Sequence, residues 1–471
     1  MRKALSLLIV LPLVAAATLS AQTATGMISG TVTDESGAVV PSAILTVTNK
    51  ATGNARTLTA NEDGLYSAPA LPAGEYEVRA EMQGFRTEVR AAQVLAGSST
   101  TVNMALSVGA TQEVVNVEAA MAQINFDSYT VAGSIERQTI QEMPLNGRSF
   151  LQLGTLEPGV QVVTGAQGAR NAPIQISILG GATNVSFTTN STLLTLDGLS
   201  LMDMLDGGNT DLNFSQEMVQ EFQITSLNFD LGTGITALGA VNIVSRSGGN
   251  DFHGSGFYFY RDHNMAAYPA LKRSAQNPNP YFARKNPGFY ISGPIKKDRA
   301  FFFFNFENTD QVQAVTFQPD LASIQPLANN YLSPARYHYR NVRFDYRFSD
   351  RHTAFLRYTH DGNVVFGPET GQPSVPSAWV NLHNWSDQFA LGVTSTLTPN
   401  FVNDFRLGWR MWSNKEDPPG LSQCQPPCVN PNGPGTTLVG SSVFSSGVTI
   451  TALQRRIARH YETQDTVSWQ K

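Results

Sequence analysis

Cysteine is almost absent from this chain. Its 471 residues contain only two, Cys424 and Cys428, and both lie in the short segment CQPPC. Two cysteines this close together in an exported loop predict a local disulfide, because oxidising compartments favour such bonds. The alternative, a metal site, needs further cysteine or histidine ligands at suitable spacing, and none lies near this segment. The sequence therefore gives no reason to expect a bound metal.

Charged residues are also scarce. They make up 15% of the chain, and the formal net charge is -5. Nucleic-acid-binding domains carry clustered basic residues, so this mildly acidic balance gives no electrostatic reason to expect a nucleic-acid partner. Low charge combined with 39 glycines and 25 prolines favours a β-rich protein with many turns.

Long apolar runs are missing after the N-terminus. The first residues have the three parts of a secretory signal: basic Arg2-Lys3, an apolar stretch from Ala4 to Ala17, and small residues ending at Ala21. A membrane anchor is the alternative, but the stretch is shorter than the roughly 18 to 20 apolar residues of a spanning helix, and Pro12 interrupts it. We therefore expect a signal peptide at residues 1–21 and an exported protein that is either soluble outside the cytoplasm or a β-barrel.

Catalytic motifs are missing as well. None of the seven histidines lies in an HxxE or HExxH sequence, there is no GxSxG, and no glycine is followed by lysine. These absences exclude the usual zinc peptidase, serine hydrolase and P-loop signatures. The sequence predicts neither an enzyme nor a cofactor.

Short alternating runs fill residues 25–107. Examples are Ile28 to Val32 and Tyr76 to Ala80, and the turn sequences DESG, NEDG and LPAG separate such runs. About seven strands in about 80 residues are typical of a small β-sandwich. The NEDG cluster lacks the remaining spacing of a calcium loop and is interpreted as a turn.

A second unit is expected at residues 123–250. A short helix is predicted from Glu136 to Glu142 because Pro144 follows it. Apolar runs at Leu193-Leu194, Phe222 to Ile224 and Val241 to Val244 stand between Gly, Asn and Asp clusters, which indicates short strands joined by tight turns.

From residue 251 onward the alternation is that of a membrane barrel. Between Phe401 and Trp412 the apolar side chains fall on one face and the charged ones on the other: Phe401, Phe405, Leu407, Trp409 and Met411 oppose Asp404, Arg406 and Arg410. A similar alternation runs from Arg340 to Phe348. Apolar-out and polar-in strands without a covering helix are typical of an outer-membrane barrel.

Eight such strands are expected, near residues 253–261, 287–295, 299–308, 338–348, 352–361, 385–397, 401–412 and 456–469. Their connections alternate between long segments and tight turns, the latter at Lys296-Lys297-Asp298, Ser349-Asp350-Arg351 and Thr398-Pro399-Asn400. Barrels of this class have short periplasmic turns and long outer loops. The tight turns are therefore expected on the periplasmic side.

Several ordered blocks resemble one family. The order LDGL, EF, LNFD and GAVNIVSRSGGNDFHGS, between Thr192 and Met265, resembles the end of the plug domain of a TonB-dependent outer-membrane receptor running into its first barrel strand. The block PLNGRSF at Pro144 resembles the start of the same plug. The order GTVTDESGAVVPSA, then NEDGLYSAPALPAGEYEV, resembles the carboxypeptidase regulatory-like domain that precedes the plug in the Oar-like subfamily. The segment from Leu231 to Leu238 departs from the family pattern, which usually shows Tyr-Gly and a basic residue there.

The resemblance implies a mainly β fold: a small β-sandwich at residues 25–107, a linker at 108–122, an α+β plug at 123–250, and the first strands of a transmembrane β-barrel at 251–471. Plugged transporters use about 22 strands, and a plug of roughly 130 residues does not fit inside eight. We therefore expect the eight strands to be the N-terminal part of a longer barrel in the outer membrane.

The linker is expected to be a short extended run without globular partners of its own. Within it, Glu113, Val114, Val115, Asn116 and Val117 look like a TonB box, the segment that such receptors present to a TonB-type energy-transducing protein in the periplasm. A β-prone segment can add as a strand to the sheet edge of another protein, using main-chain hydrogen bonds. The alternative interpretation is an ordinary linker.

Two functions are consistent with these observations. The first is a receptor that binds an extracellular solute (siderophore, glycan or peptide) and imports it to the periplasm, with ligand contacts in the outer loops, such as Asp262 to Lys285 and the loop holding the cysteines. The second is a surface adhesion or polymer-binding protein of the outer membrane that transports nothing. The sequence does not identify the ligand.

Overall fold

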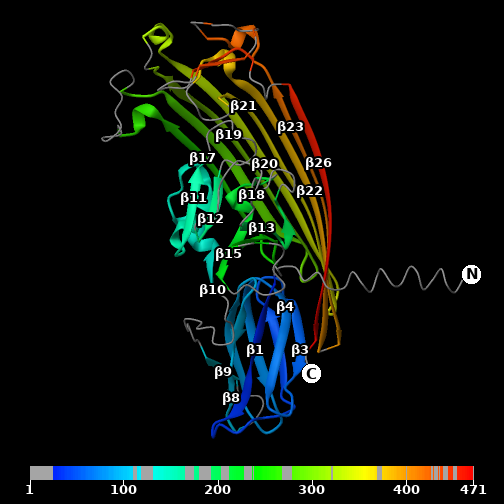
Figure 1. Cartoon of the computed structure of the whole chain (residues 1–471). Coiled ribbons are helices and arrows are strands. Elements are labelled where there is room, and N and C mark those ends of the chain that lie inside the picture. Colours follow the sequence, from blue (N-terminus) through cyan, green and yellow to red (C-terminus); the bar gives the residue numbers. More distant parts are fainter. Residues whose placement is uncertain are drawn as a thin grey trace, which may run out of the picture.

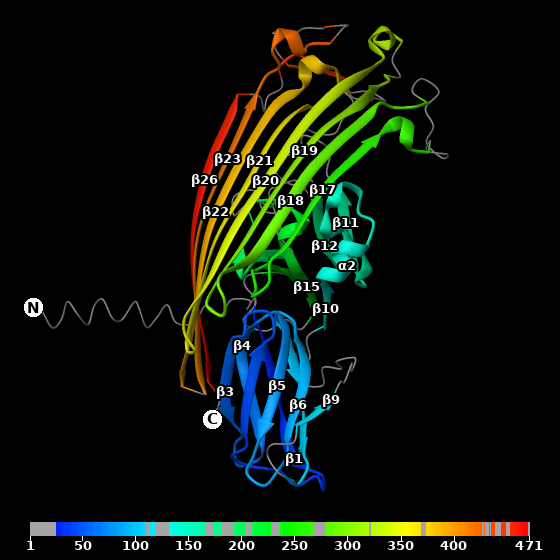
Figure 2. The same cartoon turned by 180° about the vertical axis from the view of Figure 1, so that it is seen from behind.

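The computed structural model describes residues 25–469 except for the segments 110–113, 118–130, 165–173, 180–191, 203–209, 211, 228–235, 237, 268–277, 320–321, 369–373, 399, 426–427, 429–432, 434, 439–443 and 449–452. The expected signal peptide lies outside the described residues. Three bodies are visible: an N-terminal β-sandwich, a middle unit and a tall curved sheet (Figure 1). The middle unit lies against the concave side of the sheet, and the sandwich lies below both, as the reverse view also shows (Figure 2). None of the helices among the described residues is long and apolar enough to cross a bilayer.

The sandwich consists of two sheets with their apolar faces together. One sheet contains β4 (Leu65–Pro72), β1 (Thr25–Asp34), β7 (Ser99–Thr101) and β8 (Met104–Leu106); the other contains, in spatial order, β3 (Ala55–Thr59), β2 (Ile44–Asn49), β5 (Gly74–Glu81), β6 (Thr87–Val94) and β9 (Val114–Val117). In β1 every second residue is buried through most of the strand, which places Ile28 and Val32 in the core. All buried members of this core lie between residues 28 and 106, so the sandwich closes its core with its own side chains.

Strand β9 corrects one expectation. The segment 108–122 was expected to have no globular partner, but its residues Val114 to Val117 pair in parallel with β6, with Thr87 opposite Val114 and Arg90 opposite Val117. Without β9, strand β6 would form the edge of its sheet. A sheet edge carries unpaired backbone N–H and C=O groups that bind a β-prone segment nearby. Glu113 itself lies outside the described residues.

The middle unit is a small α+β body. Its main sheet has the order β10 (Val131–Glu136), β15 (Val219–Leu227), β16 (Gly239–Ser245), β13 (Thr192–Leu196) and β14 (Leu199–Ser200). A hairpin of β11 (Val160–Thr164) and β12 (Ile174–Ile178), the helix α2 (Arg137–Glu142) and the 3-10 helices η1 (Asn146–Arg148), η2 (Phe150–Leu156) and η3 (Gln216–Met218) complete it. Strand β16 is buried at all seven positions because it lies between β15 and β13. The helix predicted at residues 136–142 is confirmed as α2.

The tall sheet is antiparallel and contains the eight expected strands in chain order. They are β17 (His253–Asp262), β18 (Phe282–Lys296), β19 (Ala300–Phe317), β20 (Asn329–Ser349), β21 (His352–Gly367), β22 (Val380–Thr398), β23 (Phe401–Asp417) and β26 (Gln454–Trp469). Within the described residues, β17 pairs only with β18 and β26 only with β23, so the sheet is open. The expectation of a mainly β fold with an incomplete barrel is confirmed.

The two faces of the tall sheet differ as expected. In β23, Asp404, Arg406 and Arg410 are at most 5% exposed, whereas Leu407, between them, is 44% exposed. The charged face is concave and is covered by the middle unit, and the apolar face is outside. This is the lumen-in, lipid-out arrangement of a membrane barrel.

The connections also follow the expected alternation. The tight turns lie near the sandwich (Figure 1). Asp298, in the turn between β18 and β19, lies beside Gly53 of the sandwich. The long connections at the other end carry the short 3-10 helices η4 (His263–Met265), η5 (Gln325–Leu327), η6 (Pro376–Ala378) and η7 (Leu421–Gln423), and the last one also carries the hairpin of β24 (Thr436–Leu438) and β25 (Phe444–Ser446). The first long loop is shorter than the predicted range from Asp262 to Lys285, since β18 begins at Phe282.

Candidate functional site

Asp197 is the centre of the contact between the middle unit and the sheet. It follows β13, and with Gly198 it forms the two-residue turn of the β13–β14 hairpin, where both residues have positive φ (50° and 81°). Asp-Gly is favoured in such a turn because it tolerates these dihedrals. The turn points the Asp197 side chain out of the middle unit, and the residue is only 2% exposed. The LDGL block is therefore the tip that contacts the sheet.

The Asp197 carboxylate is fully bound. Oδ1 accepts a hydrogen bond from the Ser245 backbone N–H (2.9 Å), and Oδ2 accepts from Ser245 Oγ (2.7 Å) and from Arg357 Nε (2.7 Å). Arg343 Nη1 lies 3.6 Å from Oδ1. Burial by itself raises the pKa of Asp197, but Arg357, Arg343 and the Ser245 bonds outweigh it, so the net pKa lies below the ordinary value. Asp197 is therefore a buried anion.

Two arginines of the sheet lie next to the Asp197 carboxylate. Arg343 on β20 and Arg357 on β21 are directly opposite each other in the register, and like charges in that position destabilise a sheet. Arg357 is fully buried, so its charge needs a partner. The Asp197 carboxylate approaches both guanidinium groups and supplies the counter-charge from another body of the molecule.

Two arginines of strand β23 also bind the β13–β14 hairpin. Arg406 donates to the Asp197 carbonyl and pairs with Asp404 (2.8 Å). Arg410 donates to the carbonyl oxygens of Ser200 (2.9 Å) and Met202 (2.8 Å). Arginines of the sheet thus satisfy backbone carbonyl oxygens of this hairpin and of the residue that follows Leu201.

A second cluster surrounds Glu217 in η3. Its two carboxylate oxygens bind Arg137 (2.5 Å) and Arg148 (2.6 Å). Arg148 also contacts Glu307 of β19 (3.2 Å), which in turn accepts from Ser215 Oγ (2.5 Å). Burial raises the pKa of Glu217, but Arg137 and Arg148 lower it by a larger amount. The net pKa of Glu217 therefore lies below its ordinary value.

Arg148 explains the PLNGR block. Gly147 and Arg148 both have positive φ (75° and 58°), and this turn directs the guanidinium toward the sheet. There it lies 3.9 Å from the centre of the Phe257 ring, a distance at which a cation is attracted by the π face. A third polar contact joins Asn213 to Asp361 of β21, through both the backbone N–H (2.9 Å) and Nδ2 (3.0 Å).

The residues singled out from the sequence lie away from these clusters. The segment Val114 to Val117 is on the sandwich, on the edge of its second sheet. Cys424 and Cys428 form a disulfide with each other in the last long connection, where the neighbouring Gln425 side chain binds the backbone N–H and C=O of Leu332 (2.9 Å each). The alternation along the strand placed Arg406 and Arg410 on the charged face of the sheet, and both are buried there, whereas Arg357 was not singled out.

Comparisons with known proteins agree with this architecture. The carboxypeptidase regulatory-like domain family matches residues 27–107, and the outer membrane beta barrel domain family matches residues 244–322 and 317–471. The TonB-dependent transporter Oar of Myxococcus xanthus is 28% identical over 296 residues, which are 59% of this chain and 26% of that protein. The outer membrane transporter YddB of Escherichia coli has a similar fold, with a TM-score of 0.52 at 12% identity over 72% of this chain and 45% of that one.

The chain spans about a quarter of the length of the curated relative it matches and less than half of that of the solved structure. Both relatives are transporters by name and not enzymes. The structure agrees with these matches. It contains a β-sandwich at the N-terminus, an open sheet with charged side chains inside and apolar side chains outside, and a middle unit attached to the concave side of that sheet. The chain therefore contains a carboxypeptidase regulatory-like domain followed by part of an outer membrane beta barrel domain, and it is similar to a TonB-dependent outer-membrane transporter.

Proposed function

We propose that the protein binds a solute at the cell surface and imports it to the periplasm, and that residues 123–250 act as the plug that closes the barrel. The observation that carries the proposal is the chemistry of the contact between the middle unit and the sheet. The middle unit has an apolar core of its own, to which the tall sheet contributes a single buried residue, Phe303. The contact itself consists largely of ion pairs and hydrogen bonds around Asp197 and Glu217.

A body with its own core that is bound through polar groups can leave its site without unfolding. Such a departure removes the Asp197 carboxylate from Arg357, while Arg343 keeps its ion pair with Asp345 on the same strand. Breaking this ion pair and the hydrogen bonds around it costs free energy. Release of the plug therefore needs an external energy source, which is the role of a periplasmic energy-transducing partner.

The segment Glu113 to Val117 is the proposed attachment point of that partner. Its described part, β9, is already in a β conformation and is the last strand of its sheet. A strand with an open edge can continue into the sheet of another protein. The segment also lies between the sandwich and the plug in the chain, so traction on it acts on both.

Import can be tested with cells of the source organism that express the full-length protein. Accumulation of a labelled ferric siderophore, an oligosaccharide and an oligopeptide is compared in wild-type cells, in cells lacking the receptor, and in cells lacking the energy-transducing protein. The proposal expects one of these classes to bind at the surface in both strains that contain the receptor but to accumulate only where the partner is also present. Surface binding of a polymer without any partner-dependent accumulation would support the adhesion alternative instead.

A further inference from the structure

Among the residues that the structure describes, hydrogen bonds attach the sandwich to the rest of the molecule at two separate points. The first is the turn between β2 and β3. The Asn250 backbone N–H, in the connection between β16 and β17, donates to the Ala51 carbonyl (2.8 Å). The Asn250 side chain also exchanges two hydrogen bonds with Asp298 in the tight turn of β18 and β19 (2.6 and 2.7 Å). Sandwich, middle unit and sheet therefore meet at one residue.

The second point is the turn between β6 and β7. The Ala96 backbone N–H donates to the carboxylate of Glu221 on β15 (2.5 Å), and Gln93 Nε2 donates to Glu136 on β10 (3.0 Å). Ala96 and Val244 of β16 form a small buried apolar cluster beside these bonds. Glu221 is 3% exposed, so this contact excludes water from a group of the middle unit.

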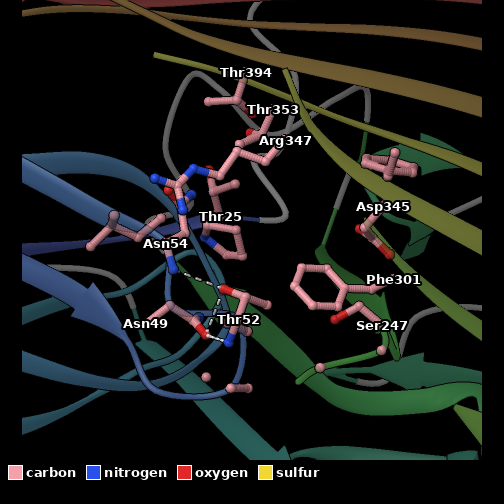
Figure 3. Close-up of a pocket in the computed structure, with 18 of the residues that line it drawn as sticks. Thr25, Asn49, Thr52, Asn54, Ser247, Phe301, Asp345, Arg347, Thr353 and Thr394 are labelled. Carbon is pink, nitrogen blue, oxygen red and sulfur yellow. Dashed lines mark hydrogen bonds between the residues drawn. The ribbon is translucent and has the colours of Figure 1, made fainter. Parts of the chain in front are cut away.

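A cavity of about 700 Å³ lies between the sandwich and the tight-turn end of the sheet. Figure 3 shows side chains from both sides that line it: Thr25, Asn49, Thr52 and Asn54 from the sandwich, Ser247 from the connection, and Phe301, Asp345, Arg347, Thr353 and Thr394 from the sheet. Asp197, Arg343 and Arg406 of the plug contact also line it. The sandwich is thus the periplasmic wall of the space directly beneath the charged site.

The same sandwich holds the segment on which a partner would pull. Strand β9 is hydrogen-bonded along β6, and β6 leads into the turn that binds Glu221. Traction applied to β9 is transmitted through these ladder bonds to the sandwich as well as along the chain to the middle unit. The two contacts of the sandwich consist of a few hydrogen bonds and one small apolar cluster, so they are weaker than the buried ion pairs around Asp197.

We infer that the sandwich is a periplasmic latch: it covers the space beneath the middle unit in the resting state and separates from it before the middle unit leaves the sheet. The inference rests on the proposed function, because it concerns the order of events during energised import. It assigns to the N-terminal domain a closing function that is distinct from ligand binding and from attachment of the partner.

Disulfide formation can report whether the latch is closed. A Cβ placed on Gly249 lies 3.5 Å from Cβ of Ala51, which is within the range of disulfides. The variant Ala51→Cys/Gly249→Cys is therefore expected to cross-link in isolated outer membranes under mild oxidation, as seen on non-reducing gels. The native cysteines are paired with each other and do not compete. Failure to cross-link, in a variant that still inserts into the membrane, counts against the docked position.

Two further changes test what closes the latch. Glu221→Ala, at the other contact, removes the acceptor of the Ala96 N–H without touching the cysteine pair. It is expected to slow cross-linking on the order of tenfold. Glu221→Gln keeps the acceptor and should cross-link at nearly the parent rate. Glu142→Ala, on the exposed end of α2, is the matched control and should change nothing. Equal rates in all of these variants would overturn the role of this contact.

A second, independent readout is access to the cavity. The variant Thr353→Cys is labelled with a bulky polyethylene glycol maleimide and, as a control of intrinsic reactivity, with N-ethylmaleimide. Slow labelling by the bulky reagent is expected with the latch closed, and labelling on the order of tenfold faster in the Glu221→Ala background. N-ethylmaleimide should react similarly in both. Equal access of the bulky reagent with and without the substitution would show that the sandwich covers nothing.

The purified periplasmic domain of the energy-transducing protein separates the latch from the proposed function. If both hold, this domain binds the receptor, slows cross-linking of the cysteine pair and speeds bulky labelling of the Thr353→Cys variant. Binding without any change in either rate overturns the latch and leaves the proposed function intact. Absence of binding contradicts the proposed function and removes the partner-driven opening with it.

Discussion

The structural role of Asp197 depends on residues that are far away in the chain. Its neighbours in sequence, Leu196 and Gly198, place it in a tight turn, and this much follows from the LDGL letters and turn chemistry. Its counter-charges, Arg343 and Arg357, lie about 150 residues later. Sequence patterns do not predict this pairing because it depends on which strand of the sheet faces the hairpin. The tight turn could therefore be predicted from the sequence, and the contact that it makes with the sheet could not.

Removing the Asp197 carboxylate should loosen the middle unit. Asp197→Ala leaves Arg357 buried without its partner, so we expect a destabilisation of about 3 to 5 kcal/mol. The measurement is the lowest-temperature unfolding transition of the purified full-length protein, together with protease sensitivity of the middle unit in membranes.

Asp350→Ala is the control for this change. Asp350 pairs with Arg347, but its side chain is 80% exposed, and an exposed pair contributes at most about 1 kcal/mol. Equal losses in the two variants would show that the Asp197 cluster does not hold the middle unit.

Glu221 should make the contact with the sandwich dependent on pH. Burial, and to a smaller extent Glu136, raises the pKa of Glu221 to about 7, although the Ala96 N–H opposes the shift. A carboxyl group whose pKa is raised in the folded protein contributes its full stability at low pH and loses it as the pH rises through that value. The loss is at most about 1.4 kcal/mol per pH unit.

The check compares wild type with Glu221→Gln, which cannot ionise. Thermal unfolding of both proteins is followed from about pH 5 to pH 9. The wild type is expected to lose stability relative to the variant as the pH rises from about 5 to about 7, and the difference should level off above about pH 7, where Glu221 is ionised in both the folded and the unfolded protein. Parallel curves over the whole range would contradict the assignment of a titrating Glu221.

At the scale of elements, the strands of the tall sheet were the most predictable part. A period of two, with apolar side chains on one face and charges on the other, identified all eight strands. Several of them are longer than expected; β20, for example, begins at Asn329 rather than near residue 338. The added residues of β20 extend toward the long-connection end, and there Tyr331, Ser333 and Ala335 still alternate with exposed residues. The parallel pairing of β9 with β6 was missed because a local pattern carries no information about a distant edge.

Strand β9 provides a prediction of its own. Val115→Pro removes a backbone N–H and fixes φ, so it should weaken strand pairing with the partner. Surface binding of the solute is expected to remain while its accumulation falls. Val115→Thr is the matched control, because threonine keeps the N–H and the preference for β structure. Accumulation at the wild-type level in the proline variant would show that residues 113–117 are only a linker.

On the scale of the whole molecule, the three bodies differ in how far each depends on the others. Among the residues that the structure describes, the sandwich has a complete core of its own. The core of the middle unit also includes Phe303 of the sheet and packs against Tyr290 of the sheet, and the tall sheet has two open edges. The order and type of the bodies could be predicted from the sequence through turn spacing and alternation. Their mutual placement could not, because it depends on single contacts such as those of Asn250 and Asp197.

The sandwich should fold when expressed alone. Residues 25–107 contain all buried members of their core, so we expect a soluble domain with a single cooperative thermal transition by circular dichroism. A variant with Val32→Asp, which places a charge in that core, is the control and should not fold. A wild-type domain that shows no cooperative transition would mean that the sandwich requires the middle unit for its stability.

The polar contact between the middle unit and the sheet has a consequence for engineered receptors. Because the middle unit packs its own core and meets the sheet mainly through charged groups, it is a transplantable module. A chimera that combines the middle unit with the barrel of a relative needs a small set of charged contact residues rather than a complementary packed surface. These residues are arginines at the positions of Arg343, Arg357 and Arg406, and a carboxylate at the position of Glu307. The long connections at the opposite end of the same strands can then be exchanged without altering these residues.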